Sequence, residues 1–316
     1  MEESIVNKLN EVLAYNEDKL YKVELEGYGD MSLKKDKFDG KHVKNFFRLN
    51  SLNLLPFLEK ISNINHNYIT YFNNILPEGN IPNHISVLMK KLNKKQIISE
   101  VIGAKITEYF GLNTPINFAM FTGKDDSRKD FVISVDFVSE NEMFDSLDDY
   151  QLEYEKGIDI KGFFEDYRIM MQDNSDFDFV SEDRVKELEN EIMLSFLVRD
   201  VLLGDSDFCS LNLGFLLNET DKKIKLINFD YEDAFVIKNL TSKHYEIIDY
   251  AIKNHPNVYQ NFINKVNTIL NSKKQINVEY KNDIHKKIVE AFIHRLTIIS
   301  NHEKSLNITQ LSIMGD

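Results

Sequence analysis

The stretch Asp207-Phe-Cys-Ser-Leu-Asn212 decides how this chain folds and what it can bind. Its Asp lies five residues before its Asn, and a later apolar run ends in a second Asp, Asp230. Carboxylate and amide oxygens accept hydrogen bonds, and they are the ligands that hard cations such as Mg²⁺ prefer. Three acceptors, none of them basic, therefore suit a site that holds a cation and a hydroxyl group together.

The segments on either side of residues 207–212 predict the structure that carries them. Ser181 is a typical helix N-cap, two acids follow it, and apolar residues then recur at helical spacing as far as Leu203. Residues 213–217 and 224–229 each read as an apolar strand, and the polar residues between them indicate a turn. The sequence therefore predicts a helix, an acidic loop and a β-hairpin in that order.

This order is typical of the catalytic loops of kinases. Phosphoryl transfer needs charge neutralisation and positioning more than covalent chemistry. We expect Asp207 to take or orient the proton of an attacking hydroxyl group, and Asn212 and Asp230 to bind Mg²⁺ against the nucleotide phosphates. The alternative is that Asp207 and Asn212 only form the turn after a helix, where both residue types are common.

The first part of the chain is rich in predicted strands. Residues 21–49 read as a strand, a glycine-containing loop and a second strand. Residues 95–110 carry an apolar stripe at helical spacing, and Gly111 ends that helix. Residues 118–122 and 131–137 are apolar strands around a polar turn. We therefore expect a β-rich region with one conspicuous helix.

The pattern then becomes mostly helical, as in residues 258–270 and 284–299. We place a hinge at residues 139–144. The sequence thus predicts an α+β fold with two lobes, a β-rich N-terminal lobe over residues 1–140 and a mainly helical C-terminal lobe over residues 141–316. A nucleotide would bind in the cleft between them.

Residues 202–216 resemble the catalytic loop of the HipA-like and CtkA-like family of bacterial serine/threonine kinases. The family pattern is Gly-Asn-x-Asp-Arg-His-x-x-Asn-x-Gly between hydrophobic residues, followed by a strand that ends in Phe-Asp, here Phe229-Asp230. Residues 98–106 and 110–115 resemble the family's Ser-Glu helix and the exit from it. The resemblance covers about residues 85–236.

The resemblance implies a protein-kinase-like fold that transfers the γ-phosphate of ATP to a Ser or Thr hydroxyl of a protein, with Mg²⁺. It implies that Asp207 is catalytic, that Asn212 and Asp230 are metal ligands, and that Glu100 pairs with a nucleotide-binding lysine. Some relatives autophosphorylate a serine in the glycine loop, and Ser32 is the matching candidate.

The nucleotide-binding lysine has more than one candidate. Lys90 and Lys91 come just before the helix that carries Glu100, an order that suits a strand lysine pairing with a helix acid. Their segment fits a strand or a helix equally, and both side chains could equally be solvated. Lys44 and Arg48, on the strand after the glycine loop, are the alternatives.

Gly27 and Gly29 are candidates for phosphate binding. Glycines let backbone N–H groups approach a phosphate closely. A plain hairpin turn would use the same two residues, and both interpretations stay open.

Two departures from the family pattern bear on activity. Phe208 and Cys209 stand where the family has Arg-His, and Asp205 stands where it has Asn. The first change removes groups that orient the loop and offset charge, and the second adds an acid near Asp207, which could raise a carboxylate pKa or strengthen cation binding. The alternatives are therefore a catalytically weak pseudokinase that binds a nucleotide or a partner, and a small-molecule or lipid kinase.

Composition limits the partners. The 316 residues carry a net charge of −13 and a hydrophobic share of 42%, as in a globular protein with no broad nucleic-acid or anionic-membrane surface. No apolar run reaches the roughly 18 residues of a membrane span. The single cysteine, Cys209, fits a reducing compartment. We expect a cytoplasmic protein, or else a secreted effector, that binds ATP and a protein substrate; a toxin would also have an antitoxin or other regulatory partner.

Overall fold

The computed structural model describes residues 2–19, 44–50, 84–123, 128–135, 138, 142–150, 152, 159–218 and 220–313. The predicted glycine loop, with Gly27, Gly29 and Ser32, lies outside these residues. The roles expected of it therefore stay predictions.

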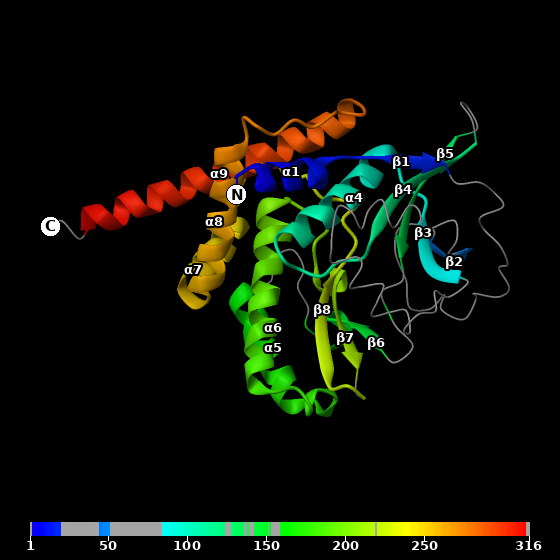
Figure 1. The fold of residues 1–316 in the computed structure, drawn as a ribbon. Coiled ribbons are helices and arrows are strands. Elements are labelled where there is room, and N and C mark those ends of the chain that lie inside the picture. The colour runs from blue at the N-terminus through cyan, green and yellow to red at the C-terminus, as the bar shows by residue number, and fades with distance from the viewer. Residues whose placement is uncertain are drawn as a thin grey trace.

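A five-stranded sheet belongs to the first half of the chain (Figure 1). Its strand order is β1-β4-β5-β3-β2, with β1 parallel to β4 and the pairs β4–β5, β3–β5 and β2–β3 antiparallel. The segment whose pattern fitted a strand or a helix is therefore a strand, β3. The strands are β1 (Glu17–Lys19), β2 (Lys44–Asn50), β3 (His84–Lys90), β4 (Asn117–Thr122) and β5 (Lys129–Val135).

Helix α4 (Lys94–Tyr109) is the conspicuous helix of this half, close to the predicted residues 95–110. Asn93 and Gln96 form a capping box at its start, and Gly111, with φ +100°, follows its end. The helix is buried on nearly every side because it packs against β4 and β5 as well as against α1 (Glu2–Leu13) and α9 (Asp283–Ile313). A helix enclosed in this way holds its side chains in fixed positions.

The second half contains a three-stranded antiparallel sheet, β6-β7-β8. Its strands are β6 (Met143–Ser146), β7 (Leu213–Asn218) and β8 (Lys223–Asn228), so the predicted β-hairpin is confirmed. The hinge predicted over residues 139–144 extends too far, because Met143 and Phe144 belong to β6 and pair with β7. Residues 139–141 lie outside the described part.

Helices form most of the second half, and Figure 1 shows them on the side of the molecule away from the five-stranded sheet. Ser181 caps α6 as predicted, since its hydroxyl accepts a hydrogen bond from the N–H of Arg184. Past Ser195 the helix continues as a π-helix over Phe196–Leu202. The helices are α5 (Ile160–Asp173), α6 (Glu182–Ser195), α7 (Ser242–Asn254), α8 (Pro256–Ser272) and α9 (Asp283–Ile313).

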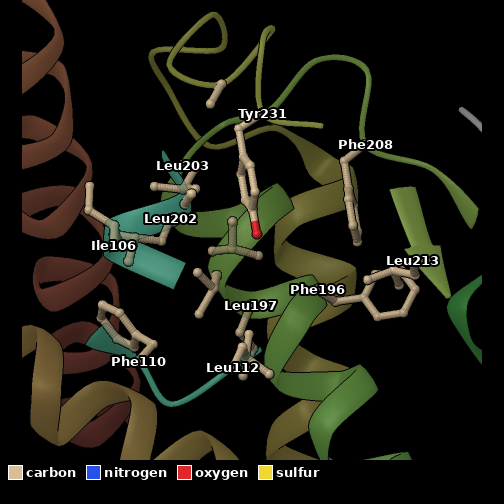
Figure 2. Close-up of a cluster of buried hydrophobic side chains, with 14 of the residues drawn as sticks. Ile106, Phe110, Leu112, Phe196, Leu197, Leu202, Leu203, Phe208, Leu213 and Tyr231 are labelled. Carbon is tan, nitrogen blue, oxygen red and sulfur yellow. The ribbon is translucent and has the colours of Figure 1, made fainter. Parts of the chain in front are cut away.

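One hydrophobic core joins α4, the π-helix and the loop that follows it. Figure 2 shows Tyr231 standing in this cluster between Leu203 and Phe208, with Phe196 and Leu213 on the side of β7. The expected α+β class, β-rich first and mainly helical afterwards, is confirmed. The domain boundary after residue 140 stays a prediction. Within the described residues, no helix is both long and apolar enough to cross a membrane.

Candidate functional site

Lys90, at the end of β3, meets two carboxylates from distant parts of the chain. Its ammonium nitrogen Nζ lies 3.4 Å from Oε1 of Glu100 on α4 and 3.0 Å from Oδ1 of Asp230 after β8. The side chains of Lys90 and Glu100 are 4% and 2% exposed. The structure thus brings three of the predicted site residues together in a buried ionic cluster.

Glu100 is fixed by further hydrogen bonds. Its Oε2 accepts a hydrogen bond of 2.6 Å from the backbone N–H of Tyr231, and its Oε1 accepts one of 3.2 Å from Nδ2 of Asn117 on β4. The Oγ of Ser134 on β5 donates in turn to Oδ1 of Asn117. Glu100 therefore links the first sheet to the segment that follows β8.

The cluster keeps Lys90 protonated. Burial favours the neutral amine, but the carboxylates of Glu100, Asp230 and Glu232 outweigh it and raise the pKa of Lys90 above its usual value. A buried charge with several partners is stable where an isolated one would not be. The cluster therefore presents a fixed positive charge next to Asp230.

Lys91 lies outside this cluster. It is exposed, immediately after the end of β3, whereas Lys90 is buried. Of the other two candidates, Lys44 is the backbone neighbour of Lys90 in the sheet, and Arg48 lies further along β2, opposite Ser86. The structure therefore separates Lys90 from Lys91 by burial, a distinction that the sequence left open.

The loop that begins with Asp207 is held to the end of β8. Asp207 is exposed, and its N–H donates to Oδ1 of Asp205 at 3.2 Å. Asn212 is buried, and its Oδ1 accepts a hydrogen bond of 3.0 Å from the N–H of Cys209. The N–H of Phe229 donates to the carbonyl of Asn212 at 3.0 Å, so Asn212 lies beside the segment that leads to Asp230.

Arg199, which the sequence analysis missed, lies between these two segments. Its Nε and Nη2 donate to Oδ2 of Asp205 at 3.1 and 2.6 Å. Its Nη1 donates to the carbonyl of Phe229 at 3.0 Å and its Nη2 to that of Asp230 at 2.6 Å. The signal in the sequence is an Arg inside the apolar run 196–203, a position where a charge requires buried partners.

The two departures from the family pattern have a structural setting. The Phe208 ring lies 5.5 Å from the Phe196 ring and 5.0 Å from the Arg199 guanidinium. Asp205 is buried against Arg199 instead of being exposed beside Asp207. Burial raises the pKa of Asp205 to about 6, although Arg199 opposes that shift. The added acid is thus part of a buried ion pair.

Asp230 has an unusual backbone conformation, with φ +64°. Asp is among the residues that tolerate this left-handed region, and the neighbouring contacts hold it there. The Tyr231 ring packs directly on Gly103 of α4, where an added Cβ would lie 2.9 Å from the Tyr231 Cβ. The backbone around Asp230 is therefore set by α4 on one side and Arg199 on the other.

The donor atoms fit a magnesium ion. Mg²⁺ is usually bound by one or two carboxylates together with phosphate oxygens and waters. Asp230 offers a carboxylate, and Asn212 offers an amide oxygen from the 3-10 turn just before β7. No group of three His, Cys, Asp or Glu side chains with the geometry of a metal site occurs in the described part of the chain. A metal ion held by these two residues would need further ligands from outside the protein.

Comparison with solved structures finds chains that are similar to this one. Neither a protein-family model nor a curated protein matches this chain. The chain is similar to the crystal structure of a Helicobacter pylori proinflammatory kinase, CtkA, with 14% sequence identity and a TM-score of 0.47. The similarity covers 72% of this chain and 93% of that chain.

Proposed function

We propose that this protein is a HipA-like, two-lobed kinase that transfers the γ-phosphate of ATP to a Ser or Thr hydroxyl of a protein, with Mg²⁺. The observation that carries the proposal is the buried cluster in which Lys90 contacts both Glu100 and Asp230. A strand lysine paired with a helix acid, next to an acid that follows a β-hairpin, is the arrangement that kinases use to hold nucleotide phosphates. An ion pair with a purely structural role would need only Lys90 and Glu100, and would not require Asp230.

Lys90 and Glu100 would hold the nucleotide. Lys90 donates to Asp230 at 3.0 Å, and a phosphate group would replace Asp230 as its anionic partner. Glu100 keeps the ammonium directed toward the site because Tyr231 and Asn117 fix its carboxylate. Apart from the release of Asp230, binding then costs little reorganisation, as preorganised sites require.

Asp230 and Asn212 would hold Mg²⁺, which supplies positive charge against the phosphate oxygens when it is bound. Asp230 becomes available for this role when its contact with Lys90 is released. The Asn212 amide oxygen accepts hydrogen bonds from the N–H of Cys209 at 3.0 Å and from its thiol at 3.5 Å, and a metal ion would replace the weaker thiol contact.

Asp207 would act on the protein substrate. Its carboxylate is exposed on the loop, where a hydroxyl group from another molecule can reach it. As the hydroxyl oxygen forms its bond to the γ-phosphorus, the bond to the leaving phosphate oxygen breaks and the hydroxyl proton passes to Asp207. An acceptor of this kind needs access to solvent, in contrast to Lys90.

The test is transfer of label from γ-labelled ATP to the protein or to lysate proteins, with magnesium. We expect transfer by the wild type and by Lys91→Met, and none by Asp207→Ala, Asp230→Asn or Lys90→Met. Product analysis distinguishes a phosphorylated protein from a phosphorylated small molecule or lipid. A wild type that transfers nothing but shows a magnesium-ATP thermal shift, lost in Asp230→Asn, would identify a pseudokinase. If the wild type shows neither phosphate transfer nor a thermal shift, the proposal is overturned.

A further inference from the structure

Arg199 is fully buried, at 0% exposed, between the two loops of the proposed active site. On one side it binds Asp205, which receives the N–H of Asp207. On the other side it binds the backbone carbonyls of Phe229 and Asp230. A single side chain thus connects the loop of the expected catalytic acid to the turn of the expected metal ligand.

The contacts of Arg199 satisfy a group that is costly to bury. A guanidinium has five N–H donors in a rigid fork, so it can hold several acceptors in one fixed geometry. Here the fork holds a carboxylate and two carbonyls. The Tyr231 ring lies 4.0 Å from the guanidinium and the Phe208 ring 5.0 Å from it, in positions that allow cation–π attraction.

The local backbone is consistent with a specific role. Arg199 lies in the π-helix Phe196–Leu202, and π-helical turns occur frequently at functional sites. The next residue, Asp200, pairs with Lys243 and His244 of α7, whereas Arg199 reaches the two loops. Neighbouring charged side chains in this segment therefore serve different parts of the molecule.

We infer that Arg199, held by Asp205, is the positioning residue that fixes Asp207 relative to Asp230. Phe208 and Cys209, the residues after Asp207, carry no positive charge, and Arg199 meets the loop from within the core. The inference rests on the proposed function for its catalytic meaning. The structural part, that Arg199 keeps the loop closed, can be tested without any activity.

Cys209 provides the probe for that test. It is the single cysteine of the chain, it lies in the loop between Asp207 and Asn212, and it is half-buried. Its thiol lies 3.5 Å from Oδ1 of Asn212, so in the closed loop it should react slowly with thiol reagents. Dithiodipyridine is uncharged, so the local charges neither attract nor repel it, and its rate, compared between variants at equal thiolate fraction, reports loop opening.

The variant is Arg199→Met/Asp205→Asn, which removes both partners and leaves no unpaired buried charge. We expect Cys209 to react at least about tenfold faster than in the wild type, because several charge-assisted hydrogen bonds that close the loop are lost. The control is Arg168→Met/Glu189→Gln, which removes an ion pair between α5 and α6 and should change the rate less than about twofold.

Asp205→Asn alone is the second variant, for the case that the double variant does not fold. It keeps a side-chain oxygen for the N–H of Asp207 but replaces one acceptor of Arg199, and we expect a smaller acceleration, about threefold. A folded double variant that reacts at the wild-type rate overturns the inference, and so does an unchanged rate in Asp205→Asn if the double variant does not fold.

Kinetics separate positioning from general stability. At a temperature well below unfolding, we expect the double variant to lose at least about a hundredfold in kcat with the KM for ATP within about threefold, because Lys90 and Glu100 are untouched. An unchanged kcat overturns the positioning role. A wild type without transfer defeats the proposed function instead, and the thiol rates still decide whether Arg199 holds the loop.

Discussion

On one side of Asp230 lie Lys90 and Glu100, both buried and held by contacts from the first sheet, α4 and the segment after β8. Asp207, by contrast, is exposed on a loop in which Leu211 is 52% exposed. The first region encloses its charges, and the second presents its charge to solvent. Both belong to the same proposed reaction.

In the proposed reaction, the first region would bind a nucleotide and the second a protein hydroxyl group. A nucleotide always has the same phosphates, so a rigid and fully partnered cluster can be built for it in advance. A protein hydroxyl arrives on a second macromolecule, and its acceptor must be reachable from outside. Stability and activity should therefore respond differently to mutation in the two regions.

Lys90→Met should have the largest effect on stability. It leaves the buried Glu100 and the partly exposed Asp230 without their shared cation, and we expect a loss of about 3–5 kcal/mol in the free energy of unfolding. Urea denaturation measures this loss. Lys91→Met, at the exposed next residue, is the matched control and should stay within about 0.5 kcal/mol. Equal losses in the two variants would contradict the buried cluster.

Gly103→Ala should destabilise the region of Lys90 and Glu100 through Tyr231. The new Cβ would lie 2.9 Å from the Tyr231 Cβ, and overpacking outweighs the gain in helix propensity, for a net loss of about 1–2 kcal/mol. Gly162→Ala in α5, where a Cβ meets nothing within 4 Å, should instead stabilise the protein by about 0.5 kcal/mol. Thermal unfolding of both variants checks the opposite signs.

Asn212→Ala tests the boundary between the regions. It removes the acceptor for the Cys209 N–H, which should cost about 1 kcal/mol, and it should also abolish phosphate transfer. Asn218→Ala removes a similar bond, to the N–H of Asp221, in an exposed turn and should cost less than about 0.5 kcal/mol. Transfer activity that survives in Asn212→Ala would exclude Asn212 as a metal ligand.

Asp207→Asn should have the smallest effect on stability. An exposed, near-isosteric change is expected to stay within about 0.5 kcal/mol, measured by urea denaturation. The same variant should lose phosphate transfer, while the magnesium-ATP thermal shift persists. A loss of more than about 1 kcal/mol would show that Asp207 belongs to the buried network, and the contrast between the two regions would then fail.

The sequence predicted those parts of the fold whose pattern is local. The helix around Glu100, the N-cap at Ser181 and the hairpin before Asp230 have clear periodicity and clear end signals, and the structure contains all three. The sequence could not predict that Lys90 is buried and Lys91 exposed. Successive residues of a strand point to opposite faces, so a strand would bury only one of the two lysines, but the segment also fitted a helix.

Arg199 shows where reasoning from local pattern stops. Its partners Asp205, Phe229 and Asp230 lie from 6 to 31 residues along the chain, and two of its acceptors are backbone carbonyls that leave no mark in a sequence. The contact of Asn117 with Glu100 could not be predicted either, because it depends on how β4 lies against α4. Such contacts follow from tertiary packing and not from residue spacing.

The 140 residues that separate Lys90 from Asp230 have a consequence for the newly made protein. At roughly 5–20 residues per second of synthesis, Lys90 and Glu100 leave the ribosome roughly 7–28 seconds before Asp230. During that interval the charges of the first half have no access to their final partner. The ionic cluster therefore stays incomplete until the second half has been translated, and a truncated translation product would carry Lys90 and Glu100 without Asp230.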